Sequence, residues 1–121
     1  MILELMEIIL YAQDMDAQVR FYRDLLGLEV TYPRGLVDYS AESWVTFGTG
    51  ACTLALHGGG QRDLGRDAPK IVFRVAQIEE ARRALLAQGV SLGDLFEAAP
   101  GTRVVNGVDP EGNPFSLESN R

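Results

Sequence analysis

The sequence runs twice through one order of predicted elements: a strand, a helix and three strands. In the first half, Leu3–Tyr11 is a nearly continuous apolar run of the kind found in strands. A helical pattern begins near Asp14 and Asp16 and ends at Gly27, where a left-handed cap is expected. The three later strands of this half are predicted at Leu28–Tyr32, Ser43–Phe47 and Ala51–His57.

The second half repeats this order. Lys70–Val75 is rich in β-branched residues, and an apolar stripe at helical spacing follows from Ile78 to Gly89. Three strands are predicted near Leu92–Glu97, at Thr102–Val108 and at Phe115–Glu118. Asn106-Gly107 conflicts with this scheme, because alone it indicates a hairpin turn, whereas the repeat places it inside a strand. The pattern predicts an α+β fold.

Composition narrows the class of protein. A chain of 121 residues can build one domain around its own core. The net charge is -6 and the sequence contains no Lys/Arg cluster, which argues against a nucleic-acid partner. Glu4 and Glu7 interrupt the apolar N-terminal run, and no stretch approaches the roughly 20 apolar residues of a membrane span. We therefore expect a cytoplasmic protein without a membrane partner.

Alternation along the strands collects polar side chains on one face of the predicted sheet. That face is expected to carry Glu7, Tyr11, His57, Lys70, Arg74, Ser116 and Glu118. A face open to bulk water would also be polar. However, Ile9, Val72 and either Trp44 or Phe47 are expected among these residues, and a mixed face is more typical of a ligand surface.

Two motifs carry a family resemblance. They are Phe-Tyr-Arg-Asp-Leu-Leu-Gly-Leu-Glu-Val from Phe21 to Val30, and Asp-Pro-Glu-Gly-Asn-Pro-Phe-Ser-Leu-Glu from Asp109 to Glu118. With the support of Thr53–His57, the chain resembles the vicinal oxygen chelate superfamily, which includes glyoxalase I, bleomycin-resistance proteins, extradiol dioxygenases and fosfomycin-resistance enzymes. The resemblance implies a single domain over residues 1–121, with βαβββ modules at about 1–60 and 68–121 that form a cupped mixed sheet. It also implies a homodimer and a small-molecule ligand.

The resemblance also directs attention to a metal site. Ligands of metal-binding members align with Glu7, Ala55, Lys70 and Ser116 of this sequence. Of these only Glu7 suits a cation, because alanine has no donor, lysine is normally protonated and serine is a weak ligand. His57 and Glu118 each lie two positions further along their strands, on the same face. Glu7, His57 and Glu118 together would suit one divalent ion such as zinc, nickel, manganese or iron.

The same residues also allow a site without metal. Lys70 and Arg74 would bind an anionic group, while His57 transfers a proton near neutral pH and Glu7 or Glu118 serves as a base. Alternatively, Glu7 and Lys70 form an ion pair that only orders the sheet. The remaining predicted substrate contacts are Tyr11, Trp44 and Ser116.

Two functions therefore follow as hypotheses. The first is a glyoxalase-like lyase or isomerase that acts on a small oxygen-bearing substrate, with or without a metal ion. The second is a metal-free binding protein that sequesters a small molecule or drug, as bleomycin-resistance proteins do. A dioxygenase fits less well, because one chain with a single histidine cannot supply the two histidines of the iron triad.

Overall fold

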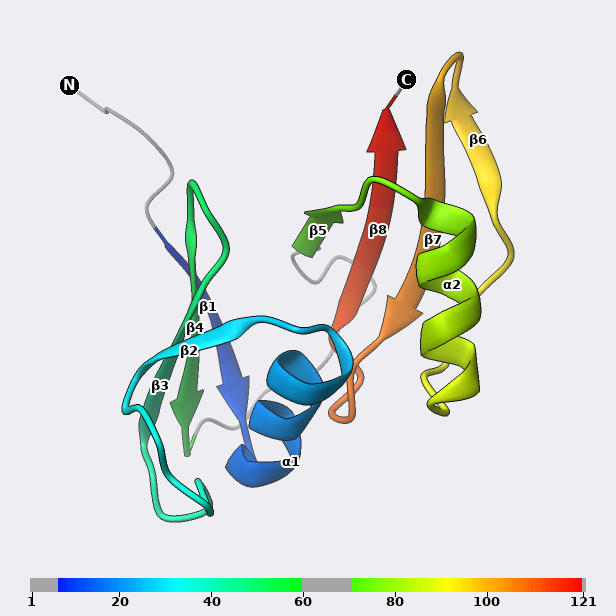
Figure 1. Cartoon of the computed structure of the whole chain (residues 1–121). Helices are drawn as coiled ribbons and strands as arrows, with labels where there is room; N and C mark the ends of the chain where they lie inside the picture. Colours follow the sequence, from blue (N-terminus) through cyan, green and yellow to red (C-terminus); the bar gives the residue numbers. More distant parts are fainter. Residues whose placement is uncertain (1–6, 60–70, 121) are drawn as a thin grey trace, which may run out of the picture. The chain divides into compact units, whose positions relative to one another are not determined.

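The computed structural model describes residues 7–59 and 71–120, and the chain divides after residue 63 into two compact units. Each unit contains one four-stranded mixed sheet with helical structure between its first two strands (Figure 1). The strand orders are β1-β4-β3-β2 in the first unit and β5-β8-β7-β6 in the second. In both, the first and last strands in sequence are parallel neighbours and the other pairs are antiparallel. The predicted α+β fold of two βαβββ modules is confirmed.

The first unit follows the predicted order of elements. Its elements are β1 (Glu7–Ala12), α1 (Met15–Arg20), η1 (Phe21–Leu25), β2 (Glu29–Tyr32), β3 (Trp44–Gly48) and β4 (Thr53–Gly58). Asp14 caps α1 by accepting a hydrogen bond from the amide of Ala17 at 3.0 Å. The helix continues through the π-helical turn η1 and stops before Gly27, whose φ of 75° suits a residue without a Cβ.

The core of this unit lies between the helical segment and one face of the sheet. Val19 and Tyr22 of the helical segment are fully buried, as are Val45, Phe47 and Leu56 of the sheet. The opposite face carries the other set of alternating side chains. The predicted division of the strands into an apolar face under the helix and a mixed open face is therefore correct.

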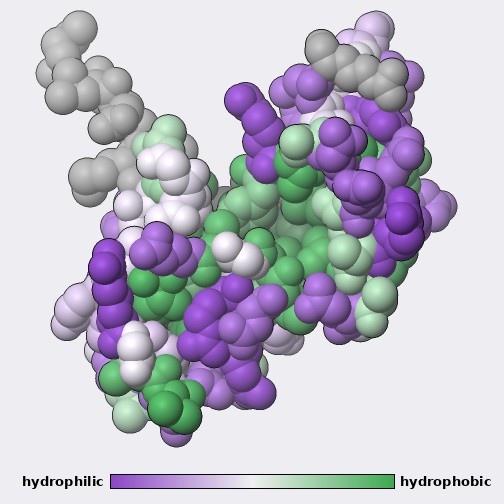
Figure 2. Space-filling model, in the orientation of Figure 1, coloured by the Kyte–Doolittle hydropathy of each residue, from purple (hydrophilic) through white to green (hydrophobic). Residues whose placement is uncertain are grey.

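A long connection between β2 and β3 is fastened to the start of α1 through Tyr39. The backbone amide of Tyr39 donates to Asp16 Oδ1 at 3.0 Å, and its hydroxyl donates to the carbonyl of Pro33 at 2.7 Å. The Tyr39 ring is buried, whereas Leu36 and Val37 at the tip of the connection are exposed. In Figure 2, apolar surface is visible at the lower left, where Figure 1 draws this connection.

The second unit repeats the topology with one shift in boundaries. Its elements are β5 (Ile71–Arg74), α2 (Ile78–Ala87), β6 (Phe96–Ala99), β7 (Thr102–Val108) and β8 (Pro114–Asn120). The strand predicted near Leu92–Glu97 begins only at Phe96, and Leu92 instead forms an isolated bridge to Gly107. Asn106-Gly107 lies inside β7, as the repeat predicted and the local turn signal did not.

Position 107 requires glycine because neighbouring side chains leave no room for a Cβ, and not because of an unusual backbone angle. A Cβ at this residue would lie 2.7 Å from Leu92 Cδ2 and 2.8 Å from Phe115 Cζ. Phe115 is fully buried and directly opposite Gly107 in the sheet, so it has little room to move.

We expect Gly107→Ala to lower the free energy of unfolding by about 1–3 kcal/mol through overpacking. Urea unfolding followed by circular dichroism measures the change. Gly93→Ala is the matched control, because its Cβ would meet nothing closer than the Asn106 carbonyl oxygen at 3.7 Å. Equal stabilities of the two variants would contradict the steric explanation.

Candidate functional site

The open face of the first sheet brings three predicted site residues into one row. Tyr11, His57 and Trp44 occupy paired positions on the neighbouring strands β1, β4 and β3. The Tyr11 and His57 ring centroids are 5.2 Å apart, and those of Trp44 and His57 are 5.9 Å apart. Tyr11 and His57 are exposed and Trp44 is half-buried. We call these three side chains the ring row.

The surroundings of the ring row on this face are apolar or weakly polar. Ile9 lies two residues before Tyr11 and is 45% exposed, while Ala55 beside it is buried. Thr46 follows on β3, where its hydroxyl is 2.7 Å from that of Thr31. The ring row therefore adjoins an apolar side chain that is open to solvent, and this combination is suited to contact with a planar organic molecule.

The hydrogen bond of His57 determines which ring nitrogen carries the proton in its neutral form. His57 Nδ1 lies 2.7 Å from the carbonyl oxygen of Gly58. A carbonyl oxygen only accepts, so Nδ1 must carry the proton in this contact. In the neutral imidazole, Nε2 then holds a lone pair that can accept a hydrogen bond or a proton. The geometry thus provides one directed acceptor beside two aromatic rings.

Glu7 lies on the same open face but at the opposite end of its strand. It pairs with Thr53, whereas His57 pairs with Tyr11. Four register positions separate Glu7 from His57, which corresponds to roughly 13 Å at the usual rise of a strand. Both side chains cannot reach a single ion, since metal–ligand distances are about 2 Å.

The predicted ligand set of Glu7, His57 and Glu118 for one metal ion is therefore corrected, because its first two members lie too far apart. Among the described residues, no group of three His, Cys, Asp or Glu side chains is placed to hold a metal ion. The sequence could not reveal this error, because two residues on one face of a sheet can still lie at opposite ends of it.

The second sheet places Arg74, Glu118 and Ser116 on its own open face. Arg74 and Glu118 are direct partners on the parallel strands β5 and β8. Ser116 is buried, and its hydroxyl donates to Asn106 Oδ1 at 2.6 Å, so it is already engaged within the sheet. Lys70, predicted as a substrate or ion-pair residue, lies outside the described residues.

Sequence reasoning passed over two members of this second open face. Val104 pairs with Glu118 on one side and with Phe96 on the other, which continues the row of Arg74 and Glu118 across all four strands. Phe96 is 44% exposed. Its place on this face was missed because the sequence predicted Phe96 near the end of a strand, whereas the strand begins at this residue.

Comparison with known proteins agrees with this architecture. A model of the glyoxalase-like domain family matches residues 7–118. A glyoxalase family protein from Bacillus anthracis is 20% identical, with a TM-score of 0.80 over 100% of this chain and 98% of that one. Lactoylglutathione lyase from Agrobacterium tumefaciens is 25% identical, with a TM-score of 0.73 over 96% and 92% of the two chains.

An antibiotic binding protein, TnmS3, from a Streptomyces species is 17% identical, with a TM-score of 0.75 over 99% and 98% of the two chains. A search of curated proteins finds no match. The paired βαβββ units with their open faces define a protein of the vicinal oxygen chelate superfamily. Within it, the chain belongs to the glyoxalase-like domain family.

Within residues 7–59 and 71–120, no helix has the length and apolar character needed to cross a bilayer.

Proposed function

We propose that this protein binds a planar small molecule on the open face of its first sheet, against the ring row of Tyr11, His57 and Trp44. The exposure of these rings in register on three neighbouring strands is the observation that carries the proposal. When a flat ligand covers solvent-exposed aromatic faces, the burial and stacking of the rings stabilise the complex. The antibiotic binding protein among the structural relatives supports this kind of function on this fold.

His57 adds a chemical preference to the site. With its proton on Nδ1, the imidazole presents Nε2 as an acceptor. A ligand with a hydroxyl or N–H group at the edge of its ring would donate to this atom. We therefore expect a planar ligand with a donor to bind more tightly than its isostere without one.

A second candidate function rests on the same atom. Nε2 can also accept a proton from a carbon next to a carbonyl group and return it to the neighbouring carbon, which is an isomerisation. A glyoxalase-like lyase or isomerase of this kind is supported by the lactoylglutathione lyase among the relatives. The binding protein leaves its ligand unchanged, whereas the enzyme converts it and, in heavy water, introduces deuterium. A metal-assisted variant of the enzyme would need a ligand set other than the corrected one.

The chain's single tryptophan makes the proposal directly measurable. Trp44 gives the sole indole N–H signal in a proton–nitrogen NMR spectrum, and that signal comes from the ring row. We expect 2-naphthol to shift this signal in a saturable way, and 2-methoxynaphthalene, which has no donor, to bind roughly tenfold more weakly, as the loss of one hydrogen bond implies.

Two variants separate the ring row from general surface binding. In His57→Ala, 2-naphthol and 2-methoxynaphthalene should bind with equal affinity, because the acceptor that distinguishes them is gone. Tyr32→Leu, which removes an exposed ring outside the row, should leave both affinities unchanged. An indole signal that stays in place throughout both titrations would rule out the ring row as a site for planar ligands.

Three further expectations stay predictions: assembly into a homodimer, a cytoplasmic location, and the union of both units in one domain over residues 1–121.

A further inference from the structure

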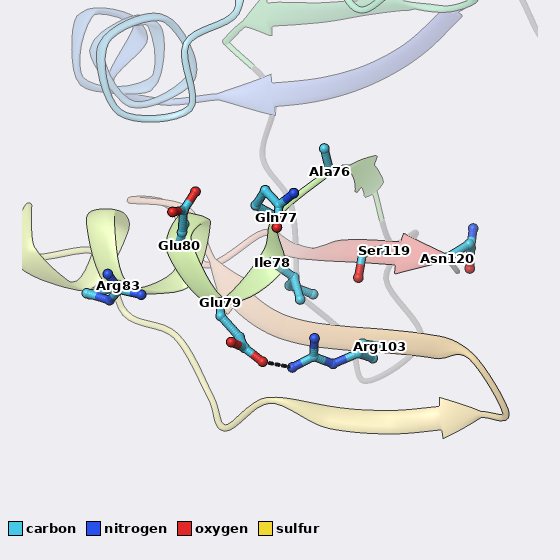
Figure 3. A pocket seen from close by; sticks show the side chains of 9 residues that line it. All are labelled: Ala76, Gln77, Ile78, Glu79, Glu80, Arg83, Arg103, Ser119 and Asn120. Carbon is cyan, nitrogen blue, oxygen red and sulfur yellow. Dashed lines mark hydrogen bonds and ion pairs between the residues drawn. The ribbon is translucent and has the colours of Figure 1, made fainter.

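A cavity of about 400 Å³ lies on the helix-covered face of the second sheet (Figure 3). It is bordered by the first turn of α2 and by the ends of β7 and β8 that meet there, with Glu79, Arg103 and Ser119 among its lining residues. Arg74, Ser116 and Glu118 belong to the other face of this sheet. The cavity is therefore separate from any ligand surface formed by the open face of the second sheet.

Two hydrogen-bond donors meet in this cavity because of strand register. Arg103 on β7 and Ser119 on β8 are direct partners, and both side chains are on the face that carries α2. Ser119 is 93% buried, since only 7% of its surface is exposed, yet it lines the cavity. Its hydroxyl makes no hydrogen bond to any residue within 71–120. As far as the described part of this unit goes, the hydroxyl therefore has unused hydrogen-bonding capacity that faces the cavity.

Glu79 holds the guanidinium of Arg103 in place. One terminal nitrogen of Arg103 donates to Glu79 Oε1, and this pair crosses from β7 to the first turn of α2 (Figure 3). The Arg103 side chain keeps only 21% of its surface exposed. A guanidinium has five N–H donors, so several remain for a further acceptor. The contact with Glu79 thus orients the group without using up its donors.

The charges around the cavity determine the kind of anion that fits. Glu79 and Glu80 are balanced by Arg83 and Arg103, all four of which line the cavity. An anion with two charges would be repelled by the two carboxylates at the start of α2. A carboxylate carries one charge and has two oxygens that match the guanidinium fork.

We propose that this cavity binds the carboxylate group of a small molecule, with Arg103 and Ser119 as the donors and Glu79 as the residue that positions Arg103. The site would be independent of the function assigned to the ring row. Its volume is in the range of small-molecule pockets, although it is at the lower end of about 300–1,000 Å³.

Butyrate, which carries one charge, and its neutral analogue butyramide provide the test. We expect butyrate to shift the amide signals of α2 and the end of β8 in a saturable way, while butyramide does not. The Trp44 indole signal should stay in place, which separates this site from the ring row. Inorganic phosphate should bind more weakly than butyrate at pH 7.5, where phosphate carries mostly two charges.

Three variants assign the donors. Arg103→Met should weaken butyrate binding at least tenfold, and Ser119→Ala should weaken it about tenfold, as the loss of one hydrogen bond to a charged group implies. Arg34→Met removes the same charge from an exposed loop of the first unit and should have no effect. If Arg103→Met fails to fold, Arg103→Lys replaces it, because lysine keeps the charge but loses the fork and should still weaken binding.

Equal shifts from butyrate and butyramide would overturn the proposal, as would unchanged butyrate affinity in Ser119→Ala together with either Arg103 variant. Tighter binding of phosphate than of butyrate would overturn the assignment to carboxylates.

Discussion

Replacing Asp109 with alanine is expected to lower the free energy of unfolding by about 3 kcal/mol. Asp109 is buried in the turn between β7 and β8, with 4% of its surface exposed. Its Oδ1 accepts from the amides of Glu111 and Asn113 at 3.0 and 2.9 Å, and its Oδ2 accepts from Asn113 Nδ2 at 2.6 Å. Alanine would leave these donors without the acceptor, and buried donors without an acceptor are costly.

Urea unfolding of the purified variant measures this loss. Asp94→Ala serves as the control, because that carboxylate is fully exposed and its ion pair with Arg82 spans 3.6 Å. Exposed pairs contribute about 0–1 kcal/mol, so the control should unfold close to the wild type. Asp109→Asn keeps one acceptor oxygen and should fall between the two. A loss below about 0.5 kcal/mol for Asp109→Ala would mean that the turn does not depend on this carboxylate.

Truncation of Tyr39 to alanine should destabilise the first unit by about 3–4 kcal/mol, because a large side chain that is almost fully buried leaves a cavity. The substitution also removes the hydroxyl that donates to the Pro33 carbonyl, and thereby loosens the connection between β2 and β3, while the backbone amide at position 39 can still donate to Asp16. We expect trypsin to cleave after the exposed Arg34 faster in this variant than in the wild type.

Two comparisons divide the effect of Tyr39 into its parts. Tyr39→Phe keeps the ring and loses only the hydrogen bond to Pro33, so it should cost about 1 kcal/mol. Tyr32→Ala removes a tyrosine that is 61% exposed and should change stability much less than Tyr39→Ala. If Tyr39→Ala and Tyr32→Ala were equally stable and equally resistant to trypsin, the fastening of this connection through Tyr39 would be refuted.

The ring row and the corrected metal set show what the alternation of side chains along a strand can predict and what it cannot. Alternation correctly assigned Tyr11, His57 and Glu7 to one face, because side chains point to opposite sides of a strand in turn. It does not state how two strands are aligned along their length. The parallel register of β1 and β4 places Tyr11 beside His57 and moves Glu7 away from it.

The sequence by itself determined the two βαβββ units, because helical and strand periodicities and the glycines at helix ends are local properties of the chain. It also determined which side chains share a face. Only the tertiary structure decided which of them meet. The strand register set the neighbours of His57, and the packing of α2 brought Glu79 to Arg103. A hydrogen bond between residues far apart in the chain joined the Tyr39 amide to Asp16 of α1. These outcomes depend on the alignment and packing of segments far apart in the chain, which periodicity does not encode.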